Sequence, residues 1–250
     1  MRIVVLGAKG GVGKSIVTLL LIRTFLERGK KILLVDRDMT GYISWLAGIR
    51  GKGLVASIVD NETGNYFTTL NIGKGILRVV KFYGDGPRLI SDSQLFSRED
   101  IGSQIREKYD EIISLPHDHV IYDNRGMVEP GELEYSLEIG IYLRKFPHTK
   151  SYWVFVSDSL KMNIEMTLDY DQYIWNRWAK NMNVVGRSLV INMVPPNYAI
   201  PYEEIGGLSR YDSVTTVPFM DELFEFTGKI ESMPSLSSLE PLAKAIESKI

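Results

Sequence analysis

A short glycine-rich stretch near the N-terminus, Ala8–Ser15, constrains the fold of this chain more than any other feature. It follows the apolar run Ile3–Leu6 and leads into the apolar segment Ile16–Leu26. A glycine turn between a strand and a helix presents successive backbone N–H groups to a phosphate chain, and the helix N-terminus adds a partial positive charge. Lys14 can then reach the β- and γ-phosphates, and the Ser15 hydroxyl can ligate Mg²⁺. The stretch therefore predicts a phosphate-binding loop.

The segments that follow alternate between strand and helix patterns. A helix over Ile16–Leu26, a stop at Gly29 and a strand over Lys31–Val35 form a strand–helix–strand unit. Further strands are predicted at 76–82, 120–123, 152–156, 184–193 and 213–217, and further helices at 41–47, 54–59, 97–113, 132–143, 163–178, 220–228 and from 239 onward. This order predicts an α/β fold: a single doubly wound domain over residues 1–250, with a mostly parallel sheet and helices on both faces, as in P-loop NTPases. Residues 61–76 are polar and aperiodic, and we expect an irregular loop there.

Composition restricts the compartment and the partners. The chain has 250 residues, of which 29 are basic and 31 acidic, so its formal net charge of −2 does not by itself nominate nucleic acid or an anionic membrane. It has no cysteine, which excludes a disulfide framework and a thiolate metal site. No apolar run approaches the ~20 residues that span a bilayer, and the N-terminal apolar stretch is not a signal peptide. We expect a soluble, cytoplasmic protein.

Three carboxylates are predicted at the same sheet edge as the phosphate-binding loop. Asp36 and Asp38 follow the second strand, and Asp123 ends the strand at 120–123. The carboxyl ends of parallel strands are where an open α/β sheet binds its ligands. A nucleoside triphosphate with Mg²⁺ needs carboxylates for the metal and for the attacking water. The spacing thus predicts a hydrolytic magnesium–nucleotide site.

The phosphate-binding loop also carries a family resemblance. The run Lys9–Ser15 resembles the deviant Walker A signature of the ParA/MinD class of P-loop ATPases. A strict Walker A loop has glycine where this chain has Ala8, and it lacks the additional lysine, Lys9. Leu33–Asp38 is similar to the switch segment of the class, and Tyr122–Asp123 to its Walker B motif.

Two later segments extend the resemblance over nearly the whole chain. Asn192 resembles the asparagine that reads adenine, and Val217–Asp221 resembles the proline-and-acid motif that closes over the base. No Asn-Lys-x-Asp motif is present, which favours ATP over GTP. The resemblance implies catalytic roles for Lys9, Lys14 and Asp38, Mg²⁺ ligation by Ser15, Asp36 and Asp123, and ATP binding by Gly10, Gly11, Val12, Gly13, Lys14, Ser15, Ile16, Asn192, Pro218 and Asp221.

The implied role of Lys9 makes the site depend on a second copy of the chain. In this class the lysine reaches across a homodimer with ATP at the interface, to the phosphates of the partner. A cation supplied in trans neutralises charge that develops on the transferred phosphoryl group. The resemblance therefore implies an ATP-dependent dimerising switch with slow hydrolysis and a candidate activating partner protein, which partitions or positions DNA or a large cellular assembly.

Two other functions use the same loop. A metabolic phosphotransferase or an ATP-dependent synthetase would transfer the phosphoryl group to a substrate, and a phosphorylated product would identify it. A nucleotide-gated adaptor would bind ATP and barely hydrolyse it. Asp38, which the resemblance implies polarises the hydrolytic water, argues against the adaptor.

The chain departs from the class in two places near the site. Asn124–Gly126 stands where the class has a proline-containing run after the Walker B aspartate. Within it, Arg125 can pair with an acidic neighbour or approach a phosphate, and the ion pair is favoured. Tyr42 stands where a small polar residue is common after the switch glycine.

Several other features are better explained by structure than by chemistry. His117–His119 is interpreted as a solvated strand entry and not as a metal clip. The aromatic side chains between Tyr170 and Trp178 are expected in the core or its covering layer. Residues 239–250 lack a basic face and are expected to pack on the sheet, so no membrane anchor is predicted. Candidates for non-specific DNA contact are Arg177, Lys180, Arg187 and Arg210.

Overall fold

Eight strands form one sheet in the computed structural model, which describes residues 1–224 and 226–250. Their order across the sheet is β3-β4-β2-β5-β1-β6-β7-β8. The strands are β1 (Arg2–Leu6), β2 (Lys31–Arg37), β3 (Phe67–Ile72), β4 (Gly75–Lys81), β5 (His119–Asn124), β6 (Ser151–Asp158), β7 (Val184–Val194) and β8 (Ser213–Pro218). All neighbouring pairs are parallel except β3 and β4. The prediction of a mostly parallel sheet is confirmed.

The antiparallel edge strand β3 corrects the expectation of an irregular loop at 61–76. It pairs only with β4, through a tight turn in which Gly73 has a φ of 58°. Three of its six residues are only half-buried, and Thr69 and Asn71 are exposed. An edge strand that packs little apolar surface lacks the hydrophobic pattern on which a strand prediction depends.

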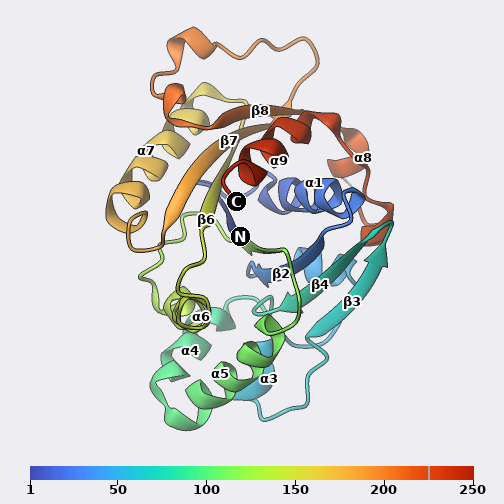
Figure 1. The fold of residues 1–250 in the computed structure, drawn as a ribbon, viewed down its shortest axis with the longest axis vertical. Coiled ribbons are helices and arrows are strands. Elements are labelled where there is room, and N and C mark those ends of the chain that lie inside the picture. The colour runs from blue at the N-terminus through green and yellow to red at the C-terminus, as the bar shows by residue number, and fades with distance from the viewer. Residues whose placement is uncertain (225) are drawn as a thin grey trace.

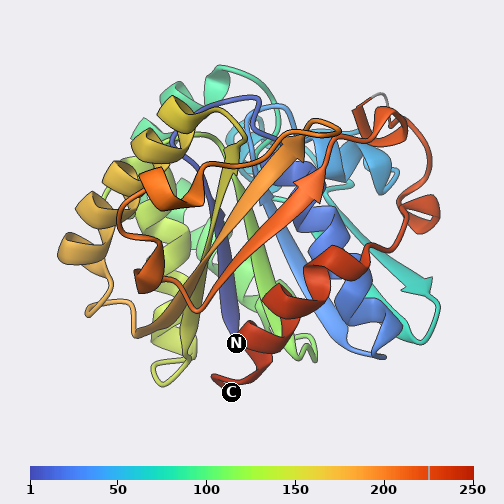
Figure 2. The ribbon, with the colours of Figure 1, turned by 90° about the horizontal axis from the view of Figure 1, so that it is seen from above.

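Helices cover both faces of the sheet, as expected (Figures 1 and 2). They are α1 (Lys14–Glu27), α2 (Tyr42–Leu46), α3 (Leu54–Val59), α4 (Arg88–Ser93), α5 (Glu99–Ile113), α6 (Leu133–Lys145), α7 (Lys161–Trp178), α8 (Asp221–Phe224) and α9 (Glu240–Glu247), with short 3₁₀ helices at 94–97, 202–204, 208–210, 230–232 and 237–239. Figure 2 shows α1 and α9 on one face and α5, α6 and α7 on the other. Of the helix predicted at 220–228, the described residues contain only α8, and residue 225 lies outside them; α4 was not predicted.

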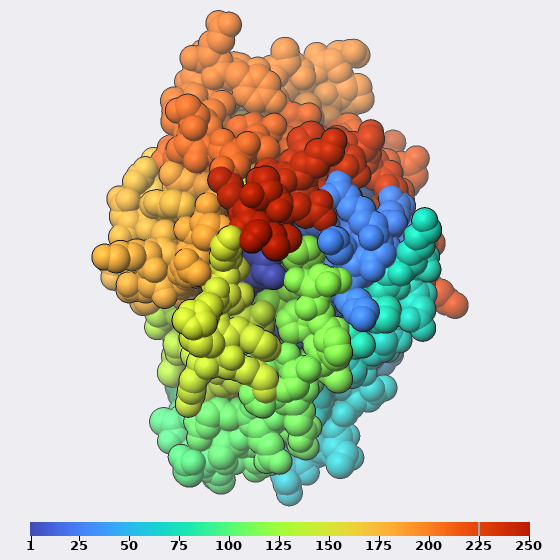
Figure 3. Space-filling view, viewed as in Figure 1, coloured from blue at the N-terminus to red at the C-terminus, as the bar shows by residue number. Residues whose placement is uncertain are grey.

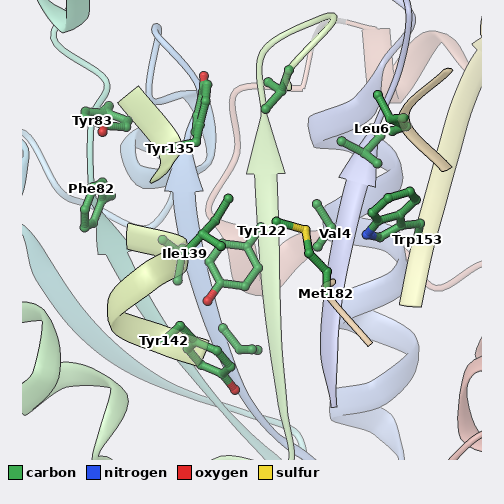
Figure 4. Packing of buried hydrophobic residues seen from close by; sticks show 14 of the residues in the cluster. Val4, Leu6, Phe82, Tyr83, Tyr122, Tyr135, Ile139, Tyr142, Trp153 and Met182 are labelled. Carbon is green, nitrogen blue, oxygen red and sulfur yellow. The ribbon is translucent and has the colours of Figure 1, made fainter. Parts of the chain in front are cut away.

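Two apolar clusters fill the space between the sheet and its helices. Alternate residues of each central strand point to opposite faces, so that Val4 and Leu6 join one cluster while Ile3 and Val5 join the other. Figure 4 shows the first cluster, in which Tyr122 of β5 lies among side chains of the neighbouring strand and of α6. Continuous apolar strands are what a parallel sheet covered on both faces requires.

The C-terminal helix α9 belongs to the second cluster. Leu242, Ala243 and Ile246 are fully buried there, which confirms that this segment packs on the sheet. Figure 3 shows both termini on one side of the molecule, with the first residues in a hollow between three later segments. This side carries the starts of the parallel strands, and their carboxyl ends lie at the opposite edge of the sheet. In the described residues, no helix has the length and apolar character that crossing a membrane requires.

Candidate functional site

The loop between β1 and α1 needs glycine at two positions. Gly11 and Gly13 have φ angles of 78° and 81°, a left-handed backbone that other residues rarely adopt. A Cβ at Gly13 would also lie 2.2 Å from Nδ2 of Asn192, so the amide would have to move away from its position at the loop. The loop therefore contacts the end of β7 directly. Its backbone is shaped as a cradle that a side chain would fill.

The two lysines of the loop have different environments. Lys14 begins α1, is 7% exposed, and donates from Nζ to the backbone carbonyl oxygen of Lys9 at 3.3 Å. Burial lowers the pKa of Lys14, and the nearby carboxylates of Asp123 and Asp38 oppose that shift. Lys9 is exposed, and the ion pairs found among residues 1–224 and 226–250 do not include it. The buried lysine is held inside the loop, and the exposed one is available to another molecule.

Asp123, the expected Walker B residue, is fixed by two hydroxyl groups of α1. Ser15 donates from Oγ to its Oδ2 at 2.6 Å, and Thr18 donates from Oγ1 to its Oδ1 at 3.1 Å. The register of β2 and β5 places Asp36 directly beside Asp123. Asp36 accepts from the backbone N–H and the hydroxyl of Ser44 at 2.9 and 2.7 Å. Ser15, Asp36 and Asp123 are thus brought together as predicted.

The two aspartates are fully buried beside each other. Burial raises the pKa of both carboxyl groups, and the charge of Asp36 raises that of Asp123 further. Two buried carboxylates in adjacent strands favour a positive ion between them. With the Ser15 hydroxyl they supply oxygen ligands, the kind that Mg²⁺ prefers. The donor set fits magnesium, although no group of three or more acidic or histidine side chains within the described part of the chain could hold a metal alone.

Asp38, the expected water-polarising residue, lies just beyond the end of β2. Its carboxylate accepts from the backbone N–H and the hydroxyl of Thr40 at 2.9 and 2.6 Å. Its own backbone N–H donates to Oδ1 of Asp36 at 3.2 Å. The side chain is half-buried. This turn keeps Asp38 at the edge of the carboxylate pair.

An apolar pocket opens beside the loop, at the ends of β7 and β8. Its lining includes Gly11, Gly13, Ile16, Asn192, Met193, Pro218, Phe219, Met220, Leu223 and Phe224. Asn192 donates from Nδ2 to the carbonyl oxygen of Val12 at 2.9 Å, which orients the amide at the pocket wall. Met193, with a φ of 54°, lies at an irregularity in the pairing of β7 with β8. The predicted residues Ile16, Asn192 and Pro218 meet here, but Asp221 is exposed at the start of α8 and does not line the pocket.

The segment after Asp123 packs against the phosphate-binding loop. A Cβ at Gly126 would lie 3.1 Å from the backbone of Lys9, and the N–H of Met127 donates to the carbonyl oxygen of Gly7 at 2.9 Å. The next residues pack against α7. Arg125 forms an ion pair with Glu132, as the sequence favoured.

The aromatic residues of α7 contact this same segment. The Tyr170 hydroxyl donates to the carbonyl oxygen of Val128, and the Trp178 indole donates to Glu129 at 3.1 Å. Tyr170 and Ile174 are buried in the cluster beneath, which confirms the expected covering layer. Tyr173 is 48% exposed and is not part of that core.

Three of the four basic residues that were candidates for DNA contact are engaged in ion pairs. Arg187 is buried and pairs with Asp171 at 2.7 Å, while Arg177 pairs with Glu129 at 3.3 Å. Arg210 lies 3.9 Å from the same aspartate and donates to Gln172. The buried pair supports the packing of β7 on α7, so Arg187 is unsuited to a phosphate contact.

Sequence reasoning missed two residues of the site, Thr18 and Ser44. Thr18 lies three positions after Ser15 on α1, and this spacing places both hydroxyls on one helix face. That signal was available in the sequence. Ser44 lies on α2, after the turn that follows β2. Its hydrogen bond to Asp36 depends on a chain reversal that the sequence does not specify.

A glycine cradle between β1 and α1, with carboxylates at the ends of the neighbouring strands, defines a P-loop nucleotide-binding protein. The chain belongs to the family described as the CobQ/CobB/MinD/ParA nucleotide binding domain, whose model matches residues 3–227. The expected kinship with the ParA/MinD class is thereby confirmed. No similar sequence was found among curated proteins.

Solved structures with the same fold cover almost the whole chain. A putative plasmid partition protein from Borrelia burgdorferi, bound to AMPPNP, is 15% identical with a TM-score of 0.59, over 100% of this chain and 99% of that one. MinD in the MinC:MinD cell division complex of Aquifex aeolicus is 16% identical with a TM-score of 0.62, over 100% and 96%. Apo McdA of Cyanothece is 13% identical with a TM-score of 0.64, over 99% and 98%. At these identities the likeness establishes the fold.

Proposed function

We propose that this chain is an ATP-dependent dimerising switch that hydrolyses ATP slowly and partitions or positions DNA or a large cellular assembly. The observation that carries the proposal is the contrast between the two loop lysines. Lys14 is buried and bonded within its own loop, whereas Lys9 projects from the same loop into solvent. A site that exposes one of its cations beside the phosphates is suited to completion by a second copy.

The residues of one copy bind and orient the nucleotide. The N–H groups of Gly10–Ser15 and the Lys14 ammonium bind the phosphates, and the pocket beside Asn192 takes the adenine. Ser15, Asp36 and Asp123 would hold Mg²⁺ directly or through water. Bound magnesium supplies positive charge to the phosphate oxygens. Asp38 accepts a hydrogen bond from the hydrolytic water.

The partner copy supplies Lys9. Its ammonium stabilises negative charge on the phosphate oxygens of the facing copy, so hydrolysis depends on assembly. Slow turnover follows when dimer formation or a conformational step limits the rate. A separate protein that binds the dimer is the expected activator.

The similar structures support the proposals that the nucleotide is ATP and that the cargo is DNA or a large assembly. The Borrelia burgdorferi protein is described as a plasmid partition protein and carries AMPPNP, and McdA of Cyanothece has an ATP complex. Related folds that carry ATP or its analogue favour ATP as the ligand of this chain. The absence of an Asn-Lys-x-Asp motif favours it as well. We further propose a cytoplasmic location, since a partitioning protein acts where its cargo lies.

The test is a light-scattering measurement of molar mass with and without Mg²⁺ and ATP. Asp38→Ala should bind ATP and accumulate as a dimer because the hydrolytic step is impaired. Lys9→Ala should bind ATP and stay monomeric, whereas Lys74→Ala, an exposed lysine on the β3–β4 turn, should dimerise as the wild type does. A monomeric Asp38→Ala protein with ATP bound would rule out the dimer. A phosphorylated small-molecule product would favour the phosphotransferase instead.

The DNA partner is tested separately. Filter binding of a non-specific duplex is measured with and without ATP over a series of salt concentrations. An ATP-dependent affinity that falls steeply with salt indicates release of counterions by a phosphate contact surface. An affinity that is the same without ATP would point to a protein cargo.

A further inference from the structure

A single hydrogen bond joins the carboxylate side of the site to the base side. The Tyr42 hydroxyl donates to the carbonyl oxygen of Phe226 at 2.7 Å. The two residues are 184 positions apart, and both are half-buried against the same apolar cluster. Tyr42 is also the residue at which this chain departs from the small polar residue of its class. The bond is therefore a property of this chain that the family motif does not provide.

At one end of this bond, the short helix α2 holds a proposed magnesium ligand. Tyr42 is the first residue of α2, and Ser44, two positions later, donates two hydrogen bonds to Asp36. The helix is fixed to the protein by Ile43 and Leu46, which are buried. Its N-cap, Gly41, packs against Gly84, where a Cβ would lie 3.1 Å from the backbone. A displacement of Tyr42 is therefore transmitted to the hydrogen bonds that Ser44 donates to Asp36.

At the other end, Phe226 lies two positions after Phe224, the last residue that walls the base pocket. Phe219, Leu223 and Phe224 come from this segment, and the N–H of Phe226 donates to the carbonyl oxygen of Leu223 at 3.4 Å. The rings of Phe219 and Phe224 lie 5.8 Å apart, and Phe224 is 72% exposed. Such an exposed aromatic ring beside a pocket gains contacts when a planar base enters it. The segment is thus the part of the pocket wall that a base would order.

We propose that Tyr42 is a positioning residue that couples occupation of the base pocket to the order of α2 and so to the seat of Asp36. The inference rests on the proposed function, because the pocket must bind the base of the nucleotide. An adenine that orders Phe219–Phe224 fixes the Phe226 carbonyl, and the Tyr42 hydroxyl then holds α2 in place. A triphosphate without a base occupies the phosphate-binding loop but does not order the pocket wall, so the hydrogen bond between Tyr42 and Phe226 does not hold α2 in place.

The first test measures backbone hydrogen exchange in residues 42–46 without relying on turnover. With Mg²⁺ present, the wild-type protein is compared with ATP and with inorganic tripolyphosphate. ATP should slow exchange in α2 roughly fivefold more than tripolyphosphate does, which is the factor that one hydrogen bond provides. In Tyr42→Phe the two ligands should give the same protection of α2, while ATP still protects the phosphate-binding loop. Tyr198→Phe, at an exposed tyrosine in the loop that follows β7, should behave as the wild type.

The second test is a double-mutant cycle for ATP affinity with Tyr42→Phe and Phe224→Ala. If the bond transmits the order of the pocket wall, the loss of affinity caused by Phe224→Ala is smaller in the Tyr42→Phe background than in the wild type. Equal losses in the two backgrounds, or extra protection of α2 by ATP that survives in Tyr42→Phe, would overturn the coupling. The proposed function has a separate failure, in which the wild-type protein binds no ATP at all.

Discussion

The indole N–H of Trp178 donates to the carboxylate of Glu129 across 3.1 Å, and this bond ties α7 to the segment that follows Asp123. Arg177 pairs with the same carboxylate, and a Cβ at Gly131 would lie 2.8 Å from the Trp178 ring. The other end of the segment packs on the phosphate-binding loop through Gly126. This segment is held by the phosphate-binding loop at one end and by α7 at the other. A conformational change at either end can therefore be transmitted to the other.

Removing the charge of Glu129 should loosen this segment. Glu129→Gln keeps the shape of the side chain but loses the ion pair with Arg177 and weakens the bond from Trp178. We expect faster hydrogen exchange across residues 126–132 and a loss of about 1 kcal/mol in the free energy of unfolding. Glu134→Gln, on the neighbouring turn of α6, is the matched control. Unchanged exchange in 126–132 would show that Gly131 and Tyr170 alone hold the segment.

Alanine at two glycines of the phosphate-binding loop should have unequal effects on stability. At Gly13 the φ of 81° and the approach of Asn192 to 2.2 Å both oppose a side chain. We expect Gly13→Ala to lower the free energy of unfolding by about 2 kcal/mol. Gly10 has open space around its would-be Cβ, so Gly10→Ala should change stability little. Urea unfolding without nucleotide measures both, and equal losses would contradict the clash with Asn192.

Most of the fold was predictable from local patterns. The four central strands, β2, β5, β1 and β6, each contain a continuous apolar run, which the sequence separates clearly from the helices between them. The prediction failed at β3, which lies at an edge, and at α4, a six-residue helix with only two apolar side chains, Leu89 and Ile90. Strand ends also differ from the prediction. β2 continues through Asp36 to Arg37, because pairing with both neighbouring strands extends it beyond the apolar run.

The site residues were predictable where a sequence motif fixes the position of a particular residue type. Lys14, Ser15 and Asp123 lie together as the spacing indicated. Asp221 lies outside the pocket lining and is exposed at the start of α8, so its predicted contact with the nucleotide stays a prediction. The bonds from Thr18, Ser44 and Tyr42 depend on tertiary contacts, and a single sequence carries little information on those.

Thr18 should affect magnesium more than it affects the fold. Thr18→Val preserves the shape of the side chain but removes one of the two hydroxyl donors on Asp123, which lies fully buried. The carboxylate then loses orientation, and we expect the Mg²⁺ concentration needed for tight ATP binding to rise about fivefold. Thr24→Val is the control on the same helix, since the Thr24 hydroxyl donates only to the carbonyl oxygen of Leu20. A titration with Mg²⁺ at fixed ATP distinguishes them, and identical midpoints would remove Thr18 from the site.

His119 should make the protein sensitive to acid. The residue begins β5 and is 1% exposed, so the expectation of a solvated strand entry is wrong for this side chain. Its ring is tilted against that of Phe25, with the ring centroids 4.7 Å apart. Neither ring nitrogen has a hydrogen-bond partner within the described residues. Burial lowers the pKa of His119 to about 4, and the positive charges of the N-terminal amine and Lys30 contribute. The imidazole is therefore neutral in the folded protein at pH 7.

The sign of the effect follows from proton binding. Between the unfolded pKa of about 6.5 and the folded pKa of about 4, the unfolded chain binds more protons than the folded one, so stability falls as the pH falls. The full shift corresponds to about 3 kcal/mol. His119→Leu should remove this part of the acid sensitivity and leave the stability at pH 7 nearly unchanged or higher. His148→Leu, an exposed histidine, should retain the wild-type profile. Urea unfolding at pH 7 and pH 4.5 measures the difference, and parallel profiles for wild type and His119→Leu would show that the buried imidazole does not govern it.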